Sequence, residues 1–300
     1  MKKILIALFI MLFVAGAMVI FAETQQPSIT KSYGVVSTTA YYKDFNEVFT
    51  GDWQKYGQKF TILQEKYFKN IYTILIIATP LIFLLHFLVI GAFKFAHSGE
   101  KIPWYSFLGR VIHWIAAVTF VIMLISGLAM IYGNLFGGGN FIRFLRYTHG
   151  IVAIVFGVTA LILFVLWVKD AIPKTYDIKW FLVMGGYLSK SQKIIKADKF
   201  NAGQKVWFWL ATLGGIIMAV TGYIMYFFAG TTDTLRISVM IHIILGMALL
   251  VMFIVHVYMG VFSVKGSLQS MIYGYKMPEE AKMLHNAHYE KLKKEGYISE

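Results

Sequence analysis

Residues 236–262, RISVMIHIILGMALLVMFIVHVYMGVF, form an apolar stretch that is long enough to cross a bilayer, and it contains two histidines, His242 and His256. A spacing of 14 residues (256 − 242) is close to four helical turns. Both imidazoles therefore face one side of the helix, about 21 Å apart along its axis. Ionisable groups at this depth are costly and usually functional. The stretch thus predicts two ligand positions on one helix, one in each leaflet.

The composition is that of a membrane protein with several spans. The 300 residues are 58% hydrophobic and 14% charged, and the mean hydropathy is +0.65. Repeated apolar runs of about 20 residues indicate membrane-spanning helices. We predict an all-α membrane protein with five transmembrane helices after a signal-like segment, at residues 70–93, 107–132, 147–169, 205–229 and 236–264.

The first residues have the pattern of a targeting segment. Residues 1–22 combine two lysines, a long apolar run and a small residue at Ala22, which is typical of a secretory signal peptide. An uncleaved signal anchor is the alternative. In either case we expect residues 23–69 to form an extracytoplasmic extension, and they contain no motif that carries chemistry.

The distribution of lysines orients the spans. Residues 169–205 hold eight lysines against three aspartates, and cytoplasmic loops are enriched in Lys and Arg. We therefore expect the mature N-terminus to lie outside and the C-terminus to be cytoplasmic. Arg143 and Arg146, on the outer side, are exceptions to this rule. Because the net charge of +13 is concentrated beside the spans, we predict no nucleic-acid partner.

The chain contains no cysteine. This excludes iron–sulfur ligation, covalent c-type haem attachment and disulfides within the chain. Any redox chemistry must rest on histidine ligands or on a bound organic cofactor. Iron–sulfur clusters or a molybdenum site would have to belong to another subunit.

Four histidines sort into two depths under the predicted topology. His149 and His242 lie toward the outer side, and His113 and His256 lie toward the cytoplasm. Two bis-histidine pairs at two depths are the arrangement that a dihaem cytochrome b needs, because two neutral imidazoles give a six-coordinate iron suited to electron transfer. The alternative is that each histidine only bonds a neighbouring helix. Four histidines that pair by depth favour two b-type haems.

Glycines and further histidines are secondary candidates for the same sites. Glycine leaves helix surface free of side chains, where a macrocycle can approach, and this surface is predicted at Gly127, Gly222 and Gly246. The remaining histidines are weaker ligand candidates. We interpret His86 as a packing or partner-contact residue, His97 as a loop residue, and His285 and His288 as solvated residues of the tail.

A second motif, FNAGQK at residues 200–205, precedes the fourth span. Asn201 and Gln204 have the spacing of a capping box, which satisfies free amides at a helix start. Gly203 is not explained by capping, since glycine in the first turn lowers helix propensity. A helix N-terminus on the cytoplasmic side presents free N–H groups and positive potential. It could therefore bind a quinone carbonyl, and capping alone is the alternative.

From about residue 108 to 290 the chain resembles the cytochrome b (gamma) subunit of membrane-bound respiratory formate dehydrogenase. The matching stretches are VIHW, RYTHG, DAIPKTYDIKWF, FNAGQK, VTGYIMY, IHIILG and VHVYMGVFSVKGSLQSMIYG. Related cytochromes of nickel–iron hydrogenases share the dihaem plan, whereas the NAGQK string favours formate dehydrogenase.

The resemblance implies a location in the bacterial inner membrane and a set of roles. His149 and His242 would hold the outer haem, and His113 and His256 the inner haem. Asn201, Gly203 and Gln204, beside His256, would form a menaquinone site. The implied partners are an iron–sulfur (beta) subunit and a molybdenum or tungsten (alpha) subunit that oxidises formate outside. Electrons would then pass inward to menaquinone.

The chain departs from the family's four-span form by an N-terminal addition. We divide it into a signal segment (1–22), an extracytoplasmic extension (23–69), an extra transmembrane helix with its loop (70–106), a dihaem four-helix domain (107–269) and a cytoplasmic tail (270–300). The alternative functions are the cytochrome b of a hydrogenase or of another periplasmic oxidoreductase and, in a different class, a non-redox anchor or transporter. A transporter usually shows internal repeats, and this sequence has no evident repeat.

Overall fold

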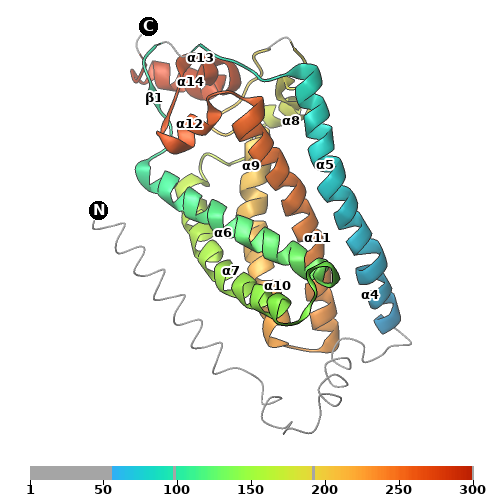
Figure 1. Ribbon diagram of the computed structural model, residues 1–300. Helices are drawn as coiled ribbons and strands as arrows, with labels where there is room; N and C mark the ends of the chain where they lie inside the picture. Colours follow the sequence, from blue (N-terminus) through green and yellow to red (C-terminus); the bar gives the residue numbers. More distant parts are fainter. Residues whose placement is uncertain (1–55, 97–98, 191–192, 299–300) are drawn as a thin grey trace, which may run out of the picture. The chain divides into compact units, whose positions relative to one another are not determined.

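The computed structural model describes residues 56–96, 99–190 and 193–298. Within these ranges five helical stretches are long and apolar enough to cross a membrane (Figure 1), at Gln58–Ile90, Phe107–Ile131, Gly139–Trp167, Ala202–Phe227 and Thr232–Ser263. The five predicted spans and the all-α class are therefore confirmed. The predicted signal segment, His97 and most of the predicted extension lie outside the described residues.

Three of the five stretches contain a π-helical segment. The first consists of α4 (Gln58–Ile62), the π-helix η2 (Leu63–Phe68) and α5 (Lys69–Ile90). The second and third are α6 (Phe107–Ile131) and α7 (Gly139–Trp167), joined through the 3-10 turn η3 (Gly133–Phe136). The fourth consists of α9 (Ala202–Trp209), the π-helix η5 (Leu210–Gly214) and α10 (Gly215–Phe227). The fifth consists of α11 (Thr232–Val257) and the π-helix η6 (Tyr258–Ser263).

The first stretch starts at Gln58, well before the span predicted at residues 70–93. The residues in between mix lysines, a glutamate and glutamines with aromatic side chains, so hydropathy marks no membrane segment there. The helical hydrogen bonds nevertheless continue through them. Part of the predicted extension is therefore the first turns of the same helix as the predicted extra span.

The segments between and after the spans are also folded. They comprise two short strands, four short α-helices and a 3-10 turn: β1 (Ile102–Pro103), β2 (Tyr275–Lys276), α8 (Tyr176–Leu182), α12 (Ser267–Ile272), α13 (Pro278–Leu284), α14 (Asn286–Lys294) and η4 (Met184–Gly186). β1 and β2 pair antiparallel, so the C-terminal segment pairs with the loop that precedes α6. An isolated parallel bridge joins Phe93 to Val264 beside it.

Contacts divide the chain into two compact units. One unit takes residues up to Ile74, Ala116–Val158 and Gly214–Ala248, and the other takes Leu75–Ile115, Thr159–Leu213 and Leu249–Glu300. The long helices α5, α6, α7 and α11 contribute a segment to each unit. The first unit contains His149 and His242, and the second contains His113 and His256. The two histidines of each pair that was predicted from depth therefore lie in the same unit, and the two pairs lie in different units.

The second unit carries the more varied core. One of its clusters brings together buried residues of α8, of α9, of the loop after α5, of the segment between η4 and α9, and of the position after η6, namely Phe93, Phe95, Trp180, Tyr187, Ala197, Ala202 and Val264. Large apolar side chains of the long helices remain exposed, for example Leu88 at 72% and Val165 at 75%. Helices that are apolar on their outer faces are expected where the surrounding solvent is lipid.

Candidate functional site

The first unit brings His149 of α7 against His242 of α11. Their ring centroids lie 6.4 Å apart, with 57° between the ring planes. A metal–imidazole bond is about 2 Å long and the bonding nitrogen lies about 1 Å from its ring centroid, so two imidazoles on opposite sides of one metal ion have centroids about 6 Å apart. The observed separation therefore fits two axial ligands of one iron.

Two hydroxyls set the orientation of this pair. Ser126 Oγ lies 2.9 Å from His149 Nδ1, and Thr221 Oγ1 lies 3.0 Å from His242 Nδ1. Each hydroxyl donates its own hydrogen to a carbonyl one turn earlier, Ser126 to Ile122 O at 2.7 Å and Thr221 to Ile217 O at 2.8 Å. The hydroxyls must therefore accept from Nδ1–H, which leaves Nε2 of both rings with a free lone pair. Such partners of ligating histidines fix the tautomer and the ring orientation.

A glycine follows each hydroxyl in the sequence and makes room for the ring. A Cβ atom on Gly127 would lie 3.5 Å from His149 Cε1, and one on Gly222 would lie 3.4 Å from His242 Cε1. Both glycines therefore adjoin the imidazole of a candidate axial ligand, and their contact with a macrocycle remains a prediction. The two glycines were predicted from the sequence, whereas Ser126 and Thr221 were not. The repeated Ser-Gly and Thr-Gly pairs were the available signal.

Gly246, the third predicted haem-packing glycine, has a different neighbour. A Cβ atom there would lie 2.4 Å from the hydroxyl oxygen of Tyr72, a residue of α5. The free surface of Gly246 is therefore occupied by the chain's own side chain.

The second unit brings His113 of α6 against His256 of α11. Their ring centroids lie 6.2 Å apart, with 55° between the planes, so the spacing fits one iron as well as that of His149 and His242 does. Trp207 of α9 stacks on His256 at 5.1 Å and 20°. His113 Nδ1 is buried and has no hydrogen-bond partner among the described residues. Imidazole pairs with an open nitrogen are a donor set that suits haem iron.

Larger metal sites are absent from the part of the chain that the structure describes. No group of three or more His, Asp or Glu side chains is placed to hold an ion there. Two-histidine axial ligation is consistent with this, because the macrocycle supplies the other four ligands of a haem iron.

The FNAGQK motif forms the start of α9, as predicted. Asn201 Oδ1 accepts from Gln204 N at 3.0 Å, and Gln204 Oε1 accepts from Asn201 N at 3.0 Å, so the capping box is complete. Gly203 packs beneath Trp180, since a Cβ atom would lie 3.0 Å from its Cη2. Capping and packing therefore account for all three residues within the chain. A ligand at this helix start is an additional role that these contacts neither require nor prevent.

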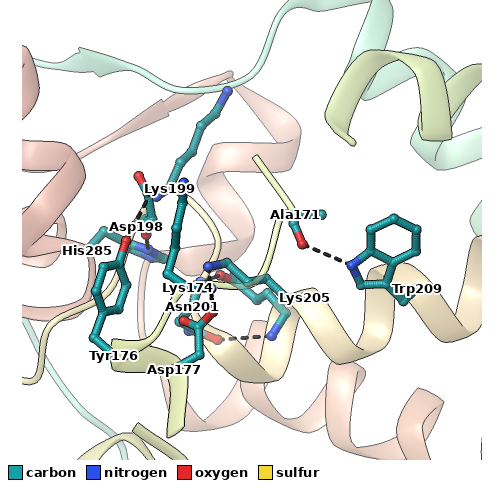
Figure 2. Close-up of polar contacts among 11 residues, drawn as sticks. Ala171, Lys174, Tyr176, Asp177, Asp198, Lys199, Asn201, Lys205, Trp209 and His285 are labelled. Atoms are coloured by element: carbon teal, nitrogen blue, oxygen red, sulfur yellow. Dashed lines mark hydrogen bonds and ion pairs between the residues drawn. The ribbon is translucent and has the colours of Figure 1, made fainter. Parts of the chain in front are cut away.

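A buried ion pair lies beside this helix start (Figure 2). Lys205 Nζ lies 2.8 Å from Asp177 Oδ2, and the two side chains are 4% and 9% exposed. The backbone N–H of Lys174 also donates to Asp177 Oδ2, whereas Asp177 Oδ1 has no partner among the described residues. Loss of one member of a buried pair costs about 3–5 kcal/mol, because the other charge is left without compensation. The pair was missed in the sequence because 28 residues separate its members.

The prediction that His285 is solvated was wrong. It is 2% exposed, its Nδ1 lies 2.9 Å from Asp198 O, and its ring packs on Trp104 at 5.0 Å. His288 packs on the same tryptophan, also at 5.0 Å. Burial lowers the pKa of His285 well below its usual value, and the neighbouring Lys276 ammonium lowers it further. Long-range contacts, which no local pattern marks, bury this part of the tail.

Asp198 joins the tail to the loop before α9. Its carboxylate accepts from the hydroxyl of Tyr176 at 3.3 Å (Figure 2). Burial, followed by the nearby Asp198 carboxylate, raises the pKa of Tyr176 to about 12. The hydroxyl therefore stays protonated and keeps its donor role at neutral pH.

Comparison with known proteins extends the sequence resemblance. Residues 104–274 match the family described as prokaryotic cytochrome b561. The chain is 31% identical over 199 residues to the cytochrome b556(Fdn) subunit of the nitrate-inducible formate dehydrogenase of Escherichia coli K12, covering 63% of this chain and 90% of that protein. It is 27% identical over 196 residues to the formate dehydrogenase cytochrome b556(fdo) subunit of the same strain, covering 62% and 90%. For the cytochrome b556 subunit of Haemophilus influenzae formate dehydrogenase the identity is 27% over 188 residues, covering 60% and 79%.

These matches confirm the likeness that the motifs indicate, and they support a membrane cytochrome b with b-type haem. All four candidate axial ligands lie within the matched residues. The helix α5 precedes them.

Proposed function

The chain belongs to the prokaryotic cytochrome b561 family, and from this premise we propose that it is the membrane-anchoring dihaem cytochrome b subunit of a formate dehydrogenase. The observation that carries the proposal is the presence of two histidine pairs with centroid separations of 6.4 and 6.2 Å. When bound, two b-type haems would supply one-electron transfer between an iron–sulfur partner subunit outside and menaquinone on the cytoplasmic side. Formate oxidation itself belongs to a separate molybdenum or tungsten subunit.

The chain's own residues hold and orient the ligands in this proposal. Ser126 and Thr221 fix the outer imidazoles through their hydroxyls. Trp207 fixes the ring of His256 by stacking on it, and it belongs to the helix that starts at Asn201. The start of α9 is therefore linked to the inner pair through less than two turns of helix. This link supports a quinone site at Asn201, Gly203 and Gln204, where free N–H groups favour a carbonyl oxygen.

The haem assignment is tested by removing one axial ligand from each pair. We expect reduced-minus-oxidised spectra of membranes that contain the chain and its native partners to show b-type haem. His242→Ala and His256→Ala should each remove about half of the signal, because each deprives a different iron of a ligand. Absence of haem from the wild-type chain would contradict the dihaem function.

The donor is identified in the same membranes by the reductant that the haems accept. Formate should reduce them, whereas reduction by hydrogen and not by formate would assign the chain to a hydrogenase.

The quinone site needs a variant that spares the capping box. Gln204→Glu keeps an acceptor for the N–H of Asn201, and glutamate serves in capping boxes as well as glutamine does. The variant replaces the amide donor by a negatively charged oxygen and leaves the capping acceptor in place. We expect both haems to remain, and their oxidation by menaquinone analogues to slow by about tenfold, a loss of about 1.4 kcal/mol that is typical of a hydrogen bond to a neutral group.

Asn201→Ala is the matched comparison for the capping role. It removes the cap and should lower stability by about 1 kcal/mol. Oxidation of Gln204→Glu at the wild-type rate would show that the motif has a capping role alone.

A further inference from the structure

The helix α5 precedes the residues that match the family, 104–274, and the proposed function does not use it. Most of its large side chains are apolar and exposed, such as Ile74 and Leu85 at 62% each. A helix that served only as an anchor would need nothing else. It nevertheless carries Tyr72 and His86, two polar side chains at membrane depth, where such groups are costly unless they are paired.

Tyr72 contacts α11 next to the outer ligand. Its hydroxyl donates to Ile243 O at 3.0 Å, and Ile243 directly follows His242. The side chain is 6% exposed. A Cβ atom at Gly246 would clash with the Tyr72 hydroxyl oxygen, so any larger residue there would require this side chain to move. α11 therefore has a glycine at the position where the Tyr72 hydroxyl packs against it.

His86 contacts the same chain segment just after the inner ligand. Its Nε2 lies 2.8 Å from Tyr187 O and its Nδ1 lies 2.6 Å from the hydroxyl oxygen of Tyr258. A carbonyl only accepts, so Nε2 carries the hydrogen, and in the neutral ring Nδ1 accepts from the Tyr258 hydroxyl. Phe83, one turn earlier on α5, packs on the Tyr258 ring at 4.7 Å.

Tyr258 begins the π-helix η6, two residues after His256. A π-helix interrupts the regular i→i−4 hydrogen bonding and often marks a functional position. At this position α11 loses its regular helical register, so outside contacts are needed to fix where its last turn lies. His86 and Phe83 supply such contacts.

The two contacts have the same spacing as the ligands. Tyr72 and His86 are 14 residues apart (86 − 72), as are His242 and His256 (256 − 242). Each contact lies wholly within one of the two units, Tyr72 with the outer pair and His86 with the inner pair.

We propose that α5 is a positioning helix for the haem ligands of α11, with Tyr72 setting His242 and His86 setting His256. The proposal rests on the dihaem function above. Neither residue touches a ligand ring. Tyr72 bonds the α11 backbone one residue after His242, and His86 bonds the hydroxyl of Tyr258, two residues after His256. Each contact thereby sets how the nearby imidazole meets its partner. Because the bond between iron and imidazole responds to ring orientation and to second-shell contacts, the effect should appear in the reduction potential.

The test is a redox titration of the two haems in the complete complex, with Tyr72→Phe and His86→Leu. Each haem is assigned beforehand by the spectrum that remains in His242→Ala or His256→Ala. Tyr72→Phe should change the one-electron reduction equilibrium of the outer haem about threefold, which corresponds to about 28 mV, and leave the inner haem unchanged. His86→Leu should do the reverse.

Matched controls separate positioning from general packing. Ile74→Ala and Leu85→Ala remove exposed apolar groups from the same helix and should shift neither potential. His86→Gln places an amide near the position of Nε2, so it can keep the bond to Tyr187 O. The shift in the potential of the inner haem should therefore be smaller than in His86→Leu. If His86→Leu does not accumulate, this glutamine variant serves as the test, with a smaller shift confined to the inner haem.

Two results would overturn the proposal, and they differ from a failure of the proposed function. One is full haem content with unchanged potentials in both variants, and the other is an equal shift of both haems in each variant. Either result would show that Tyr72 and His86 do not each position one ligand of α11. A wild-type complex without two b-type haems would contradict the dihaem function itself.

Discussion

At the scale of single residues, the hydroxyls beside His149 and His242 do most to define the candidate site. Ser126 Oγ accepts from His149 Nδ1 at 2.9 Å and donates to Ile122 O at 2.7 Å. Removing it leaves a buried imidazole N–H without its partner and frees the ring to turn. Loss of such a partner typically lowers metal affinity about 10–100-fold.

Ser126→Ala should therefore lower retention of the outer haem by about tenfold or more and leave the inner haem in place. The measurement is the haem content of the purified complex during exchange against apo-myoglobin, with the two haems distinguished by their spectra. Ser126→Thr keeps the hydroxyl and should behave as the wild type. Equal retention in Ser126→Ala and Ser126→Thr would show that the hydroxyl does not support the ligand.

The four histidines could be predicted from the sequence, whereas the residues around them could not. Depth in a membrane follows from hydropathy and charge. The pairing of His149 with His242 and of His113 with His256 can therefore be predicted without any knowledge of packing. The hydrogen-bond partners depend on the rotation of each helix, which hydropathy does not determine. Hydropathy does not distinguish Trp207 and Ser126 from the other side chains of their helices, and only the fold shows that each contacts a histidine.

At the scale of elements, the spans were predicted and the tail was not. A span is marked by about 20 apolar residues in a row, and for this reason α6 (Phe107–Ile131) starts where it was expected. The C-terminal helices α13 and α14 are short and polar. The burial of His285, between these two helices, depends on partners far away in the sequence, such as the ring of Trp104 and the backbone carbonyl of Asp198.

The burial of His285 predicts that the tail responds to pH. Its pKa in the fold lies well below the usual 6.5, first because of burial and second because of Lys276, and the pKa of His288 is lowered by burial and by Lys199. The backbone carbonyl of Asp198 and the carboxylates of Asp198 and Asp170 oppose these shifts only in part. An unfolded histidine takes up a proton near pH 6.5, whereas the folded one does not, so stability falls as the pH drops below about 6.5.

Hydrogen exchange of residues 278–294 at pH 7.5 and pH 5.5, corrected for the intrinsic rate, should therefore show weaker protection at the lower pH. The spans should keep their protection under both conditions. His285→Phe removes the main titrating group and should reduce the difference. Equal protection at the two pH values would contradict the role of the buried histidines.

At the scale of the whole molecule, the direction of electron transfer depends on which side of the membrane each end of the chain occupies. The lysine-rich segment 169–205 and the tail indicate the cytoplasmic side, and the glycine-rich turn that contains Gly137, Gly138 and Gly139 indicates the outer side. Under this orientation α9 starts on the cytoplasmic side and the pair of His149 and His242 lies toward the outside. The opposite orientation would place quinone reduction outside and would remove its contribution to a proton gradient.

The chain has no cysteine of its own, so single introduced cysteines report the orientation without background. Leu135 is 75% exposed in the turn before α7, and the side chain of Lys291 is 64% exposed in α14. A charged, impermeant maleimide added to intact spheroplasts should label Leu135→Cys and leave Lys291→Cys unlabelled, because the bilayer excludes it from the cytoplasm. After permeabilisation both variants should react. Labelling of Lys291→Cys alone in intact cells would reverse the orientation, and the proposed inward path of electrons from the outer haem to menaquinone would then be wrong.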